Sequence, residues 1–155
     1  MTAGAHAVTV EVGAGTMLSA DQRERLGYSQ AVRAGLLAGV SMTESLMLQV
    51  ALGGWWFPSD LGTGRGTMFG LGLRFEPKVG ALGRLVLDGH PAITRSGGLP
   101  RFGFDAGLGY ELAPQPWLGV GPMLRYGQVR ALDADGTDDA KFWSLCLAVT
   151  LRTGP

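Results

Sequence analysis

The chain has 155 residues, which is enough for one domain with a core of its own. It carries 13 basic and 13 acidic residues, and this zero net charge argues against nucleic-acid binding, which usually needs a basic surplus. No apolar run approaches the roughly 18 residues of a membrane helix, and the single cysteine, Cys146, rules out an intrachain disulfide and a cysteine-based zinc cluster.

Large apolar residues alternate with glycine or charged residues along most of the chain, most clearly over residues 101–112. Successive side chains of a strand point to opposite faces, so each such segment has one apolar face and one small or polar face. The pattern recurs about eight times. In chain order, the expected strands cover residues 6–17, 28–40, 46–57, 67–76, 81–90, 100–112, 117–129 and 140–152. These are lengths typical of membrane-spanning strands.

The connections between these segments alternate in length. Residues 41–45, 76–80 and 113–116 form short turns, whereas residues 18–27, 58–66, 91–98 and 130–139 form four longer, more polar loops. Ser19 and Gln22 make a weak helix-capping pattern in the first of these loops. Short turns at one end and longer loops at the other predict an all-β, up-and-down barrel of about eight antiparallel strands, with both termini at the short-turn end.

The polar phase of the strands indicates which face lies outside. It consists mostly of Gly and Ala with single Arg, Asp or Glu residues, although a water-facing strand is normally rich in Lys, Glu, Thr and Ser. Glycine is costly in a strand, but in a narrow barrel it leaves room for a long neighbouring arginine. The pattern therefore favours a transmembrane barrel with its apolar face outward. A soluble, lipocalin-like carrier with the faces reversed is the alternative, and Pro122 within an expected strand counts against a regular ladder.

Aromatic residues of the apolar phase lie near the ends of the expected strands. Such a distribution predicts two girdles at the membrane interfaces. The predicted interface aromatics are Trp55, Trp56, Phe102, Tyr126 and Trp143 near the long loops, and Phe75, Tyr110 and Trp117 near the short turns.

The strand pattern, the loop alternation and segments such as 101–107 and 119–122 resemble the small eight-stranded outer-membrane barrels of Gram-negative bacteria. The likeness to the membrane domain of the outer-membrane protein A family covers essentially the whole chain, residues 1–155, as a single domain. It implies a bacterial outer-membrane location, although no signal peptide follows Met1. The implied partners are lipid or lipopolysaccharide and possibly other envelope proteins or a fused periplasmic domain, with no nucleic acid.

One departure concerns the C-terminal end. Such barrels usually end in an aromatic residue, and Leu151 stands in that place here. The resemblance implies either a weak variant of this signal or a chain cut before a periplasmic domain.

Charged residues of the inward phase are expected to pair, because an unpaired charge in a low-dielectric lumen is expensive. The predicted lumen network consists of Glu11, Arg33, Arg74, Arg84, Asp88, Arg101, Asp105, Glu111 and Arg125, with Arg152 in the same phase. A salt-bridged plug predicts a structural or anchoring role, or a partner-binding one. A small-conductance pore for ions or small solutes is the alternative.

Candidate catalytic residues are few. His90 follows Asp88 at the expected loop end of its strand, and Ser96 lies in the next expected loop, but a nucleophile, base and orienter within reach of one another are not apparent. Cys146 is expected to be an inert interior residue, and His6 suggests no chemistry. The sequence predicts no enzyme and no cofactor, with an outer-membrane lipid-modifying enzyme kept as a further alternative.

One acidic patch lies in the last long loop. It contains Asp133, Asp135, Asp138 and Asp139 and half of a calcium-loop pattern, without the downstream bidentate glutamate. A solvated loop is expected, with calcium binding or divalent-bridged lipopolysaccharide contact as the weaker hypothesis.

Overall fold

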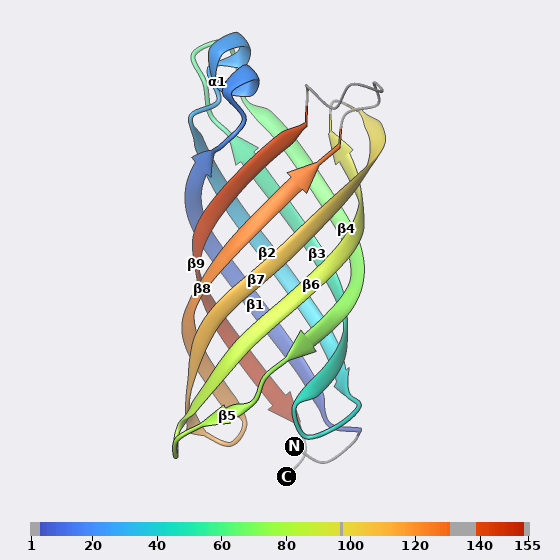
Figure 1. Ribbon diagram of the computed structural model, residues 1–155, viewed down its shortest axis with the longest axis vertical. Coiled ribbons are helices and arrows are strands. Elements are labelled where there is room, and N and C mark those ends of the chain that lie inside the picture. Colours follow the sequence, from blue (N-terminus) through green and yellow to red (C-terminus); the bar gives the residue numbers. More distant parts are fainter. Residues whose placement is uncertain (1–3, 97, 131–138, 154–155) are drawn as a thin grey trace.

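The computed structural model describes residues 4–96, 98–130 and 139–153. Within these residues, eight long antiparallel strands close into a barrel (Figure 1). The strands are β1 (His6–Met17), β2 (Gln30–Ser41), β3 (Leu46–Phe57), β4 (Gly64–Phe75), β6 (Gly83–Ser96), β7 (Leu99–Gln115), β8 (Leu118–Val129) and β9 (Ala140–Thr153). Each pairs with its neighbours along the chain, and the pairing of β1 with β9 closes the barrel. A two-residue strand, β5 (Lys78–Val79), pairs with the start of β6.

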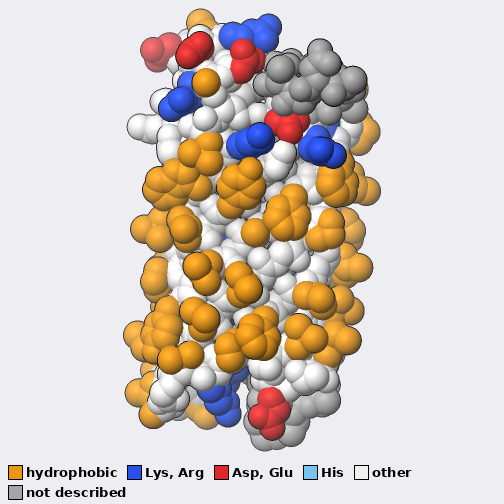
Figure 2. All heavy atoms as spheres, in the orientation of Figure 1, with side chains coloured by type: hydrophobic (Ala, Val, Ile, Leu, Met, Phe, Trp, Pro, Cys, Tyr) orange, Lys and Arg blue, Asp and Glu red, His pale blue; other side chains and the backbone are white. Residues whose placement is uncertain are grey.

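The apolar side chains of the strands face outward and the glycine-rich phase faces the lumen, as the sequence predicts. On β9, Leu145 and Leu147 are 57% and 58% exposed, whereas Ser144 and Cys146 are 1% and 2% exposed. Figure 2 shows the outward apolar side chains as a belt around the barrel wall. A strand of 12 residues, rising about 3.3 Å per residue and tilted by about 40°, crosses roughly 30 Å. The fold class of a transmembrane barrel is thus confirmed, and the reversed, lipocalin-like arrangement is wrong.

The two ends of the barrel differ (Figure 1). Both termini and β5 lie at the short-turn end, as expected, and helix α1 (Ala20–Leu26) lies at the loop end. Gly27 ends the helix in a left-handed conformation at φ 68°, which glycine adopts without steric cost. None of the described residues belongs to a helix long and apolar enough to cross a membrane.

One of the four longer loops that the sequence predicts is instead mostly strand. β6 continues past residue 90 to Ser96, and β7 begins at Leu99, so residues 91–96 belong to the barrel wall or its extension. Pro91 can lie in this strand because the β4–β6 pairing is interrupted between Gly89 and Ala92, where its missing N–H is not needed.

Pro122 is accommodated in the same way as Pro91. It pairs in register with Leu147 of β9, but the β7–β8 pairing is interrupted between Met123 and Val120, on its other side. The register irregularity of this ladder lies at 112–115 rather than at the proline. Pro122 is therefore compatible with a strand at this position.

Glycines of the inward phase make room for arginine. A Cβ atom on Gly107 of β7 would lie 2.6 Å from Nη1 of Arg125 and 2.8 Å from Oδ1 of Asp88, well inside van der Waals contact. By contrast, a Cβ atom on Gly89 would meet its nearest neighbour, the ring of Phe104, at an ordinary 3.6 Å. The absent side chain of Gly107 is therefore part of what holds the Arg125 guanidinium in place.

We predict that Gly107→Ala lowers the free energy of unfolding by about 1–3 kcal/mol, because the added methyl group displaces a packed guanidinium. Gly89→Ala is the matched control and should stay within about 0.5 kcal/mol of the native chain. Urea unfolding in detergent micelles measures both. Equal effects of the two substitutions would contradict the assigned role of Gly107.

Candidate functional site

Arg125 of β8 lies at the centre of the lumen and is fully buried. Its Nη2 and Nε donate to the two carboxylate oxygens of Glu11 at 2.6 and 2.8 Å, and its Nη1 donates to Asp88 and, at 3.1 Å, to Asp105. Arg33 donates to both oxygens of Asp105 at 2.5 and 3.1 Å. We call these five residues the central cluster.

A second group of charges lies nearer the short-turn end. Glu76 accepts hydrogen bonds from Arg74 at 3.0 Å, Arg84 at 3.4 Å and Arg152 at 3.1 Å. Glu111 pairs with Arg74 at 3.2 Å and with Arg152 at 2.6 Å. We call these five residues the basal cluster.

The two clusters have complementary charge. The central cluster has three carboxylates and two guanidiniums, and the basal cluster has two carboxylates and three guanidiniums, so the ten buried groups together are neutral. Removing charges from water is expensive unless they are paired with good geometry. Multiple contacts per guanidinium meet that condition here.

The structure brings most of the predicted network together, with two differences. Arg101 belongs to neither cluster and lies at the loop end. Glu76 was missed because it was assigned to a turn, although it shares its phase with Arg74 two residues earlier. The predicted residues found in the clusters are Glu11, Arg33, Arg74, Arg84, Asp88, Asp105, Glu111 and Arg125, together with Arg152.

The sequence predicted His90 at the loop end of its strand, but it lies in the middle of β6. It is 0% exposed and points into the lumen, with Nδ1 3.8 Å from Asp88, and neither ring nitrogen has a hydrogen-bond partner among the described residues. Ser96 lies six residues further along β6, about 20 Å away at 3.3 Å per residue. Cys146 is buried, with Sγ 3.7 Å from the hydroxyl of Ser144. The pair of His90 and Ser96 therefore has no catalytic geometry.

Three described side chains in the lumen could together hold a cation. Asp88, His90 and Asp105 offer ligand atoms within 4.8 Å of one another. Their carboxylates already accept from Arg125 and Arg33, however, and a divalent cation would have to displace these guanidiniums.

The acidic loop lies mostly outside the described residues, which exclude Asp133, Asp135 and Asp138. Asp139 is described and is buried, and its Oδ2 accepts from Nε2 of Gln128 at 2.8 Å. The calcium hypothesis therefore remains a sequence prediction.

The predicted interface aromatics face outward with one exception. Trp55 is 3% exposed and packs inside the barrel, because it alternates with its outward neighbour Trp56 on β3. Tyr126 is partly buried in the outward phase of β8. The exposed members are Trp56, Phe75, Phe102, Tyr110, Trp117 and Trp143.

Aromatic side chains, of which Tyr28 is partly buried and the others are buried, form a layer between the central cluster and the loops. The Phe142 ring lies 5.2 Å from both Trp55 and Phe57, and Tyr28 lies 5.8 Å from Phe57. Sequence reasoning did not assign Phe57, Tyr28 or Phe142 to the interior. The alternation of the strand could have shown that Phe57 shares a face with Trp55, since it follows Trp55 by two residues.

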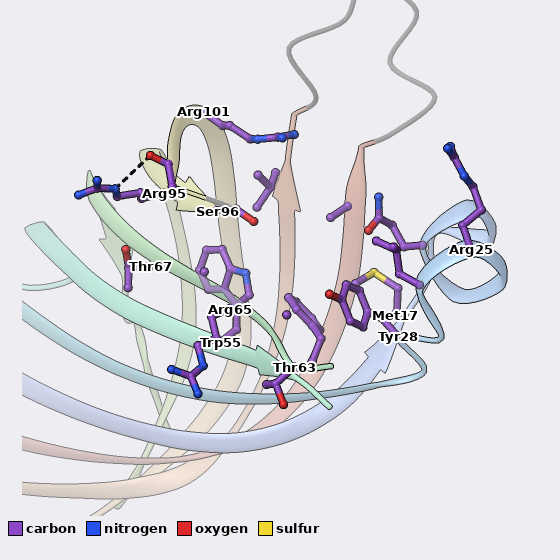
Figure 3. A pocket seen from close by; sticks show the side chains of 18 of the residues that line it. Met17, Arg25, Tyr28, Trp55, Thr63, Arg65, Thr67, Arg95, Ser96 and Arg101 are labelled. Atoms are coloured by element: carbon purple, nitrogen blue, oxygen red, sulfur yellow. Dashed lines mark hydrogen bonds between the residues drawn. The ribbon is translucent and has the colours of Figure 1, made fainter. Parts of the chain in front are cut away.

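Above this layer, a cavity of about 780 Å³ opens at the loop end (Figure 3). Tyr28, Trp55 and Phe57 of the aromatic layer line it, and we call these three residues its floor. Ser96 and Arg101 of the β6–β7 hairpin line another side. The lumen thus has, from the loop end downward, a cavity, an aromatic layer and two charged clusters.

Comparisons with known proteins identify the fold. No protein-family model matches the sequence, and no curated protein matches it. Neisserial surface protein A has a similar structure at a TM-score of 0.74 and 14% identity, covering 96% of each chain.

Two further structures are also similar. For Ail of Yersinia pestis the TM-score is 0.60 at 12% identity, covering 99% of this chain and 100% of that one. For the N-terminal barrel domain of Pseudomonas aeruginosa OprF it is 0.58 at 14% identity, covering 95% and 97%. The chain therefore has the fold of the small bacterial outer-membrane barrels, as the resemblance of the sequence implied.

We predict that Arg125→Met lowers the free energy of unfolding by about 3–5 kcal/mol, because it leaves Glu11 and Asp88 as buried carboxylates without their guanidinium partner. Arg25→Met is the control. Arg25 pairs with Asp21 on the exposed surface of α1, and its loss should change stability by less than about 1 kcal/mol. Urea unfolding midpoints in micelles measure the difference. The assigned role of Arg125 is wrong if the two variants unfold at the same midpoint.

Proposed function

We propose that this protein is an integral outer-membrane barrel with a closed lumen, and that it serves as a structural or anchoring platform whose loop end meets partners. The apolar belt supports the membrane location, since most large side chains on the outer wall would otherwise be exposed to water (Figure 2). The fold shared with outer-membrane barrels supports the same location. The proposed role is not catalytic.

The observation that carries the closed-lumen proposal is that ion pairs cross the bore. Around the closed barrel, β2 and β7 are opposite strands, and Arg33 on β2 pairs with Asp105 on β7. Arg152 on β9 likewise reaches Glu76, which follows β4 on the opposite wall. A hydrated ion would have to separate these buried pairs in order to pass. The alternative of a small-conductance pore is therefore less well supported.

We predict that the native barrel gives no stable current steps in a planar lipid bilayer. The variant R33A/D105A/E76A/R152A removes both pairs that cross the bore and keeps the lumen neutral, so it should give measurable steps. Arg25→Ala on the surface should behave as the native barrel. Heat-modifiable gel migration checks that each protein is folded before recording. Stable steps from the native barrel would contradict the proposed closed lumen.

A group of basic residues at the loop end supports both the orientation of the barrel and a lipid partner. On the eight long strands that the structure describes, the charged residues of the outward phase are Arg65, Arg95 and Lys141, and all of them lie at the loop end. Arg130 follows the end of β8 and is also exposed. Figure 2 shows basic side chains directly above the apolar belt. We call these four residues the basic collar.

The position of the basic collar suits contact with lipid phosphates. Basic side chains extend readily from the apolar boundary to a charged interface. Each contributes about 1 kcal/mol of attraction when it is near an anionic surface. We propose that the collar contacts the phosphates of lipopolysaccharide, with the loop end directed out of the cell.

We predict that lipopolysaccharide raises the urea midpoint of the barrel in phosphatidylcholine vesicles, and that R65Q/R95Q/R130Q/K141Q loses most of this increase. Lys78→Gln, on β5 at the opposite end, is the control and should keep the increase. The contact is wrong if lipopolysaccharide stabilises the four-residue variant as much as the native chain.

A further inference from the structure

Four arginines line the loop-end cavity, and none of them belongs to the central or the basal cluster. Of the four arginines that line it, Arg25 and Arg65 point away in Figure 3, and Arg95 bonds to the carbonyl of Gly98 at the rim. Arg101 of β7 extends across the cavity. Its Nε is buried and has no hydrogen-bond partner among the described residues.

The floor beneath Arg101 is aromatic. Tyr28, Trp55 and Phe57 come from the β1–β2 connection and β3, and their rings pack against one another or against Phe142. The floor therefore offers mainly ring edges and faces, with the Tyr28 hydroxyl and the Trp55 indole N–H as its polar groups.

Two glycines of β4 give these rings their space. A Cβ atom on Gly64 would lie 2.7 Å from the Tyr28 ring, and one on Gly66 would lie 2.5 Å from Nε1 of Trp55. The aromatic floor thus depends on positions where β4 has no side chain.

We propose that this cavity binds an amphipathic anion, a molecule with a flat apolar body and one carboxylate, sulfonate or phosphate group. The anionic group pairs with the guanidinium of Arg101, whose fixed N–H donors match the geometry of such oxyanions. The apolar body lies against Tyr28, Trp55 and Phe57. The volume of about 780 Å³ falls within the range of small-molecule sites.

The ligand reaches this site from the outer medium rather than from the bilayer. Trp55, Phe57 and Arg101 belong to the inward phase of their strands, so the barrel wall separates the cavity from lipid. The site goes beyond the proposed structural role and does not depend on it, because ligand binding in micelles is measurable whether or not the lumen conducts.

Trp55 provides a reporter for the test. The variant W56F/W117F/W143F removes the other three tryptophans, which lie on the outer face, and leaves Trp55 alone. The probe is 4-nitrobenzoate, a flat anion whose nitro group quenches indole fluorescence, and 4-nitrobenzamide is its neutral counterpart. Each is titrated into the folded barrel at a fixed detergent concentration.

We expect 4-nitrobenzoate to quench Trp55 with a saturating curve. Arg101→Gln should raise its apparent Kd about tenfold, as expected for the loss of one ion pair in a partly enclosed site. Arg101→Lys should recover part of the affinity. The Kd of 4-nitrobenzamide should be weaker and should not respond to Arg101→Gln, and Lys78→Gln on β5, at the opposite end of the barrel, should leave both values unchanged.

Three results would overturn the proposal. The first is quenching that rises linearly without saturation, since that indicates collision or micelle partitioning. The second is equal affinity of the benzoate and the benzamide in the native cavity. The third is equal quenching in a protein that keeps Trp143 as its only tryptophan, because Trp143 faces outward.

Discussion

Ten charged groups share a lumen too narrow to hydrate them, and the rest of the structure follows from the need to pair them. A buried carboxylate or guanidinium without a partner costs several kcal/mol. Each charge therefore has to meet an opposite one within the lumen. The Arg33–Asp105 pair joins opposite walls, and Arg125 joins Glu11 of β1 to Asp88 of β6. These contacts tie together strands that share no backbone hydrogen bonds.

The same requirement explains the composition of the wall. Long arginines fit beside positions without side chains, which accounts for glycine at sites such as Gly107. Because the charges occupy the inside, the large apolar side chains occupy the outside, and the barrel surface becomes compatible with lipid. Because ion pairs fill the bore, we propose that the interaction surfaces lie on the outer wall and at the loop end. The basic collar and the cavity beneath Arg101 lie in those places.

The period-two pattern was sufficient to predict the fold, because strand phase and glycine content are local properties of the sequence. The pattern did not predict the orientation of residues at which two local sequence signals conflict. Trp55 and Trp56 were both assigned to the interface, although adjacent residues of a strand cannot share a face. His90 was placed at the loop end of a strand expected to stop at residue 90, whereas β6 continues to Ser96 and a gap in the β4–β6 ladder accommodates Pro91.

The partners of the lumen ion pairs and the loop-end cavity could not be predicted from the sequence for a different reason. Which carboxylate meets Arg125 depends on how the strands are staggered around the closed barrel, and single-sequence patterns contain no information on this stagger. The cavity depends on side chains from several strands and on α1. The most direct test of the central claim is a scan of single spin-labelled cysteines over residues 143–149 of β9, in a Cys146→Ala background for the other positions and in lipid bilayers. Lipid-soluble oxygen should reach labels at residues 143, 145, 147 and 149, and labels at the intervening positions should be protected from it. A uniform profile, or one in which a water-soluble nickel complex reaches residues 145 and 147 best, would contradict the outward apolar face and the filled charged lumen.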